Sequence, residues 1–282
     1  MLPAAIRDLI KPPPGFDIDF GRPRNAPALV PFNGISWKVF SNPVALFVGG
    51  IAAVLLELAE PSVRSGVWDH SNFRADPVTR LRRTGFAALV TVYAPRAEAE
   101  RMIAAVVKMH ERVTGTTPDG LPYRANDPRL LEWVHATALF GFLEAYHCYV
   151  SPLSLEEKSR AFMEGQEAAR LYGAEHPPRS WPEWEQLLAR TAPGLEDSAI
   201  LREFLDLMEA APILPAWLRP MQRLLVRAAV ELTPYPMRAY PSLQRRGLHG
   251  GEAAIVRLLG KGAKALPLSS LPPAQATRRM CG

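Results

Sequence analysis

Cysteine is scarce in this chain of 282 residues, which contains only Cys148 and Cys281. Two cysteines without a Cys-x-x-Cys pair exclude a disulfide framework, so we expect a reducing compartment. The N-terminal residues carry Arg7 and Lys11 before a run of three prolines, without the apolar stretch of a secretory signal. We therefore expect a cytoplasmic protein.

The chain also lacks a dominant charge and a long apolar run. It has 33 Lys and Arg residues against 28 Asp and Glu residues, a net charge of +5 that is spread along the chain. This balance does not favour a nucleic-acid partner. The longest apolar run, residues 44–56, contains Gly49 and Gly50. A membrane-spanning helix needs about 20 apolar residues, so this run predicts a buried core helix and no transmembrane segment.

Strand signals are nearly absent, because the one Asp-Gly pair, Asp119-Gly120, lies in a polar loop. Apolar residues recur with helical spacing, and many of the 28 prolines fall between apolar stretches as helix boundaries. The pattern predicts an all-α protein: one compact, bundle-like helical domain, to which the family resemblance described below adds a buried cofactor pocket. We expect an N-terminal arm at 1–40, the domain at 41–262 and a C-terminal tail at 263–282, with Arg278 and Arg279 solvated. The expected helices are 43–59, 78–93, 97–113, 128–150, 155–172, 182–190, 199–209, 216–232 and 251–259.

Capping residues support several of these boundaries. Asp76, Ser154 and Ser180 each precede an expected helix and can accept a hydrogen bond from its first free amides. Ser154 and Ser180 are each followed three residues later by glutamate, which is the capping-box spacing. Gly115 and Gly173 stand where a left-handed residue would close the preceding helix.

The common catalytic motifs are missing, including the nucleophile elbow, the phosphate-binding loop, the zinc-protease helix and the dinucleotide fingerprint. Two histidines remain. His110 shares a helix face with Ile103 and Val106, and His135 lies in a stripe that includes Leu139. A buried neutral imidazole can be a structural side chain bonded to backbone and hydroxyl groups, or it can be a metal ligand.

Polar residues are dense between positions 57 and 84. Arg80 and Thr84 are four residues apart and therefore project from one side of a helix, where they could hold an anionic or oxygenic ligand. The alternative is that Arg80, Arg82 and Arg83 form a solvated face and that Thr84 only fills a turn.

Residues 57–173 contain, in order, several sequence motifs that are typical of one protein family. They include Leu-Glu-Leu-Ala-Glu-Pro, Gly-Val-x-Asp-His-Ser, Arg-Leu-x-Arg-Thr, His-x-x-Val-x-Gly, Pro-Asp-Gly-x-x-Tyr and Leu-Leu-x-Trp-Val-His-Ala-Thr. In these fragments the chain resembles the catalytic domain of latex-clearing proteins, or rubber oxygenases. That family also contains a fungal oxygenase of mycophenolic acid biosynthesis and many uncharacterised bacterial proteins.

The resemblance implies a helical domain that binds haem b through one axial histidine and uses O₂. It assigns the iron ligand to His110, with His135 as the reserve, and places an Arg-x-x-x-Thr pair, Arg80 and Thr84, near the haem. Latex-cleaving members are longer and exported, so we expect an apolar small organic or lipid-like substrate, unsaturated ones included, in place of rubber. An electron donor is a further expected partner.

Other polar residues gain expected roles from the same resemblance. The haem propionates would pair with cations drawn from Arg80, Arg82, Arg83 and Arg124. Asp69 and His70 are candidate acid and base groups, although such a pair can equally serve as a helix cap. Two alternatives stay open: a haem carrier or sensor without turnover, and a haem-free helical interaction protein whose apolar segment near Val44 packs on a membrane or partner.

Overall fold

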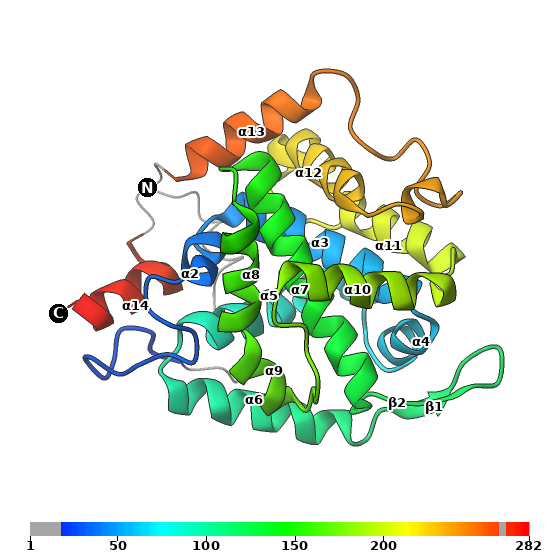
Figure 1. Ribbon diagram of the computed structural model, residues 1–282. Helices are drawn as coiled ribbons and strands as arrows, with labels where there is room; N and C mark the ends of the chain where they lie inside the picture. The colour runs from blue at the N-terminus through cyan, green and yellow to red at the C-terminus, as the bar shows by residue number, and fades with distance from the viewer. Residues whose placement is uncertain (1–17, 265–268, 282) are drawn as a thin grey trace.

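Most apolar stretches of the chain become helices in the computed structural model, which describes residues 18–264 and 269–281 (Figure 1). This arrangement confirms the predicted all-α class, while residues 1–17 of the expected arm and 265–268 and 282 of the expected tail lie outside the described residues. The helices are α2 (Ile35–Phe40), α3 (Pro43–Ala59), α4 (Pro61–Asp69), α5 (Pro77–Tyr93), α6 (Arg96–His110), α7 (Pro128–Tyr149), α8 (Leu155–Glu164), α9 (Gln166–Tyr172), α10 (Trp181–Thr191), α11 (Ala199–Ala210), α12 (Arg219–Leu232), α13 (Glu252–Ala263) and α14 (Pro272–Cys281), with short 3-10 turns at Ala192–Gly194, Ala216–Leu218 and Met237–Ala239.

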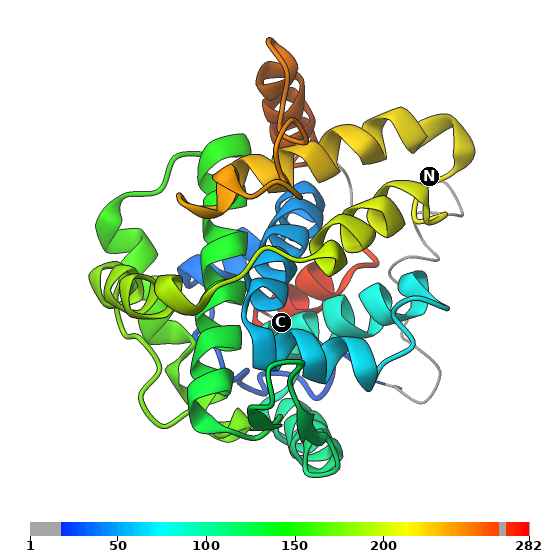
Figure 2. The same cartoon turned by 90° about the vertical axis from the view of Figure 1, so that its right-hand side faces the viewer.

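The centre of the molecule is the crossing of α3 and α7, around which the other helices pack (Figures 1 and 2). The apolar run predicted as a core helix lies in α3, where Val48, Ile51 and Leu55 are fully buried. At the crossing, a Cβ on Gly141 would collide with the carbonyl oxygen of Gly49. The two backbones can touch only because both positions lack a side chain.

A sharp corner joins α3 to α4. Glu60 ends α3 and caps α4, because its carboxylate accepts a hydrogen bond of 2.7 Å from the Val63 amide and pairs with Arg129. Within 18–264 and 269–281, no single helix is long and apolar enough to cross a membrane. Only α3 and α4 taken together reach that length and composition, and they bend by 109° at this corner.

The predicted caps are mostly present. Asp76 accepts from the Thr79 amide at 3.0 Å, the capping box at Ser154 is complete, and Gly173 closes α9 with φ of 105°. The Ser180 hydroxyl also caps α10, although the glutamate of that motif reaches back to the amide of Arg179.

Two boundary predictions were wrong. Gly115 does not close α6, which ends earlier, at His110; Gly115 instead lies in β1 (Thr114–Thr116). The helix expected at 155–172 breaks at Gly165 into α8 and α9.

The polar loop around Asp119-Gly120 forms an antiparallel hairpin of β1 and β2 (Pro122–Arg124). The sequence predicts a loop without strands here. Gly120 has φ of +84°, the left-handed conformation that this turn requires. Tyr123 is the buried residue of β2 and faces Gly66 of α4.

The two ends of the described chain pack against the body. Phe20 and Trp37 belong to the core, and α14 packs on α5. The guanidinium of Arg279 donates to the carbonyl oxygens of Ala26, at 2.9 Å, and Phe20, at 2.6 Å, and the side chain is buried. The expectation of a solvated Arg279 was therefore wrong, whereas Arg278 is exposed.

Candidate functional site

A buried glutamate on α3 is the centre of the candidate site. Glu57 lies two residues before Ala59, the last residue of α3, at the end of the apolar face of this helix. Burial raises the pKa of its carboxyl to about 7, and the Arg80 guanidinium and the Thr137 hydroxyl oppose that rise. The site therefore joins α3 with α5, which carries Arg80, and with α7, which carries Thr137.

Arg80 acts electrostatically on both this carboxyl and a histidine. Burial lowers the pKa of the Arg80 guanidinium and Glu57 opposes that change, so the pair shares a desolvated region between helices. The guanidinium stays protonated, because arginine does not lose its proton in proteins. Its positive charge also lowers the pKa of His110.

His110 is the last residue of α6, which packs on α5. Burial lowers the pKa of its imidazole, Arg80 lowers it further, and the Asn126 side chain opposes both. Nδ1 of His110 is buried and has no hydrogen-bond partner. Asn126 is fixed beside the ring because its amide donates to the Val107 carbonyl at 3.0 Å. The result is a neutral imidazole, the form in which histidine binds a metal.

His135 lies on α7 in a drier environment. Burial lowers its pKa to about 4, and its Nε2 is buried without a hydrogen-bond partner. A Cβ on Gly165 would lie 3.1 Å from that nitrogen, so the break between α8 and α9 sits directly against the ring. Nε2 of His135 therefore faces protein backbone.

The remaining cations of α5 are more exposed than Arg80. Thr84 and Arg83 are exposed, one turn beyond Arg80, whereas Nε of Arg82 is buried without a hydrogen-bond partner. Arg80 and Thr84 occupy one side of α5, as their spacing predicts, but the described interactions into the buried cluster come from Arg80.

Asp69 and His70 lie elsewhere, at the C-terminal end of α4, and both are exposed. Nε2 of His70 is 3.1 Å from the hydroxyl of Tyr123, and Asp69 contributes to raising the pKa of that tyrosine. The described interactions of this pair lead to the hairpin and, for Asp69, also to Arg74. Arg124 is an exposed residue of the same hairpin.

Sequence reasoning assigned no role to Glu57, Asn126 or Thr137. Glu57 carried the clearest signal, because it is the first charged residue after Lys38 and lies at the end of an apolar helix. A lone acid in such a helix must find a partner when it is buried. Nothing in the sequence indicates that the partner is Arg80 on α5.

The site suits a group that needs a single protein ligand. Among the described residues there is no group of three or more His, Cys, Asp and Glu side chains that could hold a bare metal ion. Haem iron, in contrast, is held by four porphyrin nitrogens and needs one or two axial side chains. His110 offers such a side chain, because its imidazole is neutral and partly buried beside Asn126.

Comparisons with known proteins identify an oxygenase family. A family model described as the catalytic domain of ER-bound oxygenase mpaB/B' and rubber oxygenase matches residues 37–263. Two uncharacterised proteins, Mb2261 of Mycobacterium bovis and Rv2237 of Mycobacterium tuberculosis, are each 29% identical over 177 residues. Those residues cover 60% of this chain and 68% of each relative. No solved structure matches significantly.

Proposed function

Because the chain belongs to the family of ER-bound mpaB and rubber oxygenase catalytic domains, we propose that it is a haem b-dependent oxygenase. It would use O₂ and act on an apolar small organic or lipid-like substrate, including unsaturated ones. The observation that carries this proposal is the neutral His110 imidazole beside the buried Arg80 and Glu57. We assign the axial ligand to His110.

The elements that carry these groups support a bound cofactor. Glu57 lies on α3, Arg80 lies on α5 and Thr137 lies on α7, and α3 packs closely against α7. Facing helices of a bundle commonly supply the side chains of a cofactor site.

When bound, haem b supplies the iron that binds and activates O₂. The side chains of the protein supply positive charge and hold the bound groups in place. Arg80 would pair with a haem propionate or with an oxygen of the ligand, and Arg82 has a buried Nε free for the same task. Thr84, Arg83 and Arg124 are exposed and would contribute at the rim of the site.

Glu57 would hold or release a proton at its carboxyl close to neutral pH, because its pKa is about 7. For Asp69 and His70 we keep the acid and base roles as a proposal that requires substrate to reach the hairpin. Their contact with Tyr123 supports the alternative, in which they stabilise the end of α4.

The compartment is also a proposal. Cys148 and Cys281 are free thiols, which suits the reducing cytoplasm. The haem-free alternative, in contrast, loses its support. The apolar segment near Val44 that was to contact a membrane or partner lies in α3, the central helix, and most of it is buried.

The visible spectrum tests the cofactor. Protein expressed with added haem should show a Soret band; His110→Ala should lose it, and His135→Ala, a matched substitution of the other inward histidine, should retain it. Wild-type protein without a Soret band would remove the haem proposal, and loss only in His135→Ala would move the iron ligand to α7.

Turnover separates an oxygenase from a carrier. The haem form is incubated with O₂, a reductant and a panel of alkenes, and oxygenated products are measured by mass spectrometry. Arg80→Ala and Thr84→Ala should lower product formation more than they lower the midpoint of thermal unfolding. Haem-loaded protein that yields no product from any alkene would favour the carrier or sensor.

A further inference from the structure

Helix α13 packs on the body through its small residues. Its inner face consists of Val256, Gly260 and Ala263, which are buried. A Cβ on Gly260 would collide with the carbonyl oxygen of Tyr149 on α7, and the amide of Asn42 donates to the Gly260 carbonyl at 2.9 Å. The helix therefore lies directly against the backbone of α7.

Two large apolar side chains of α13 point outward, whereas Leu259 is partly buried against the core. Leu258 is 72% exposed and Ile255 is 51% exposed, and residues three apart in a helix lie on neighbouring positions of one face. Ala254 is exposed beside them. An amphipathic helix normally turns its large apolar residues to the core, so this helix presents its strongest apolar surface to the outside.

Cations border this apolar face. Arg257, Lys261 and Lys264 are exposed on α13, and its one acid, Glu252, is already paired with Arg227 of α12. Arg257 also donates to the Cys148 carbonyl at 3.2 Å, and Lys264 lies 5.4 Å from the centre of the Tyr146 ring. Both contacts leave the positive charges uncompensated by a carboxylate.

We propose that this outward face of α13, formed by Ile255, Leu258, Arg257, Lys261 and Lys264, docks on an anionic lipid bilayer. An apolar stripe beside Lys and Arg is the pattern of a helix that lies in the membrane interface, where it gains from both apolar burial and anionic headgroups. A second copy of the chain fits less well, since a symmetric pairing would bring the same cations together.

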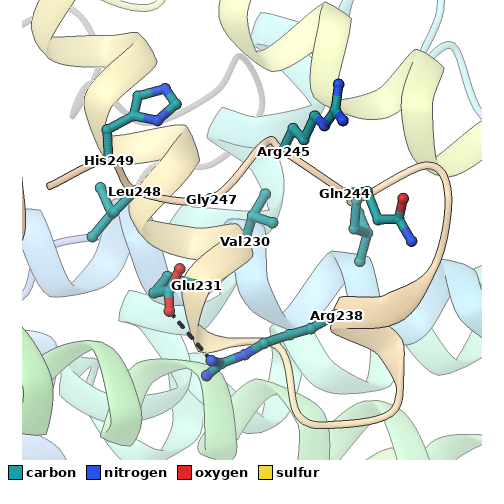
Figure 3. A pocket seen from close by; sticks show the side chains of 9 residues that line it. Val230, Glu231, Arg238, Gln244, Arg245, Gly247, Leu248 and His249 are labelled. Atoms are coloured by element: carbon teal, nitrogen blue, oxygen red, sulfur yellow. Dashed lines mark hydrogen bonds and ion pairs between the residues drawn. The ribbon is translucent and has the colours of Figure 1, made fainter.

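The nearby hollow does not supply a separate headgroup site. It lies between the end of α12 and the segment before α13, and its lining includes Val230, Glu231, Arg238 and Leu248. Figure 3 shows Arg238 turned to Glu231, with which it forms an ion pair. The attraction to anionic lipid is therefore assigned to α13 itself.

Docking through α13 also fixes an orientation. Helix α13 and helix α6, which carries His110, lie at opposite ends of the molecule in both views (Figures 1 and 2). The candidate haem site would face away from the bilayer, so the contact would tether the protein. The inference is thus independent of the proposed oxygenase activity.

Vesicle sedimentation tests the inference. The full chain is mixed with vesicles of phosphatidylcholine alone, or of phosphatidylcholine with phosphatidylserine, at low and high salt. Wild type should sediment with the phosphatidylserine vesicles at low salt and less at high salt, because salt screens the cations. The double variant with Ile255→Ser and Leu258→Ser should weaken vesicle binding, by about tenfold or more for each apolar side chain removed. Lys261→Ala should weaken it about fivefold.

The control is Leu155→Ser, which removes another exposed leucine, 58% accessible, from α8. It should bind as wild type does, and circular dichroism should show that every variant remains helical. Absence of wild-type binding at low salt, or equal loss in the control, would overturn the proposal. So would a concentration-dependent dimer, seen by light scattering, that Ile255→Ser with Leu258→Ser abolishes without any vesicle binding.

Discussion

Glu57 and His135 are buried titratable residues whose pKa values move in opposite directions. The Glu57 carboxyl rises from 4.5 to about 7, and the His135 imidazole falls from 6.5 to about 4. Between pH 4.5 and 7 the folded state binds a proton at Glu57 that the unfolded state has lost, so this residue lowers stability as pH rises. Between pH 4 and 6.5 only the unfolded state protonates His135, so this residue raises stability as pH rises.

Replacing Glu57 by glutamine should remove the contribution of this carboxyl to the pH dependence of stability. The free energy of unfolding of wild type minus that of Glu57→Gln should fall by about 3 kcal/mol as pH rises from 4.5 to 7. Urea unfolding at several pH values in this window measures the difference. His135→Leu should give the opposite slope as pH rises from 4 to 6.5. Parallel curves for wild type and Glu57→Gln would show that this carboxyl is not desolvated in the folded protein.

At this scale the sequence predicts which residues face inward but not what they meet. The helical period places His110 and His135 on apolar faces, and both are found with buried nitrogen atoms. The electrostatic interaction of Glu57 with Arg80 depends on where α3 and α5 lie in the fold, and the spacing within each helix carries no information about that. Asp69 and His70 are close in sequence to Arg80, yet their described contacts lead to Tyr123.

Among the elements, α3 and α7 cross with their backbones in close contact. Gly141→Ala should destabilise the protein by about 1 to 3 kcal/mol or more, because the added methyl group collides with the Gly49 carbonyl and the backbones must separate. Chemical denaturation measures the change. Gly262→Ala is the control, since a Cβ there meets nothing within 4 Å and alanine favours the helix by about 0.5 to 1 kcal/mol. Equal effects of the two substitutions would contradict the close crossing.

Long helices were predictable and short ones were not. Helix α3 has the predicted bounds, and α5 and α7 differ from prediction by one residue at one end. Helices α2, α4 and α14 were not expected, because each is short. Glu60 caps α4 locally, whereas α2 and α14 depend on distant partners. The carboxylate of Glu164 on α8, for example, accepts hydrogen bonds from the Ile35 and Ser36 amides and so caps α2. Such a cap lies more than a hundred residues away and has no local signal.

At the scale of the whole molecule, both ends of the described chain support the helix that carries Arg80. Arg279→Ala should cost about 2 to 4 kcal/mol, because it leaves the carbonyl oxygens of Phe20 and Ala26 without their donors inside the protein. Arg278→Ala, an exposed neighbour, should change stability by less than about 0.5 kcal/mol.

Hydrogen exchange gives the second measurement for this contact. Because α14 packs on α5, Arg279→Ala should also speed amide exchange in α5 more than in α7. Unchanged exchange in α5 would mean that α14 is an independent appendage. An arm and a tail were predicted here because proline-rich, weakly periodic segments give little sign of where they dock.

The docking of α14 has a consequence for biosynthesis. Helix α14 is the last of the described helices to leave the ribosome, and it completes the packing of α5, one of the first. Domains fold as their parts emerge, but this contact joins residues 20–26 to residue 279 and has to wait until residue 279 has been synthesised. A growing chain therefore holds Arg80 on a helix that still lacks one neighbour, so stable loading of a prosthetic group should follow translation and should be impaired by truncations that remove α14.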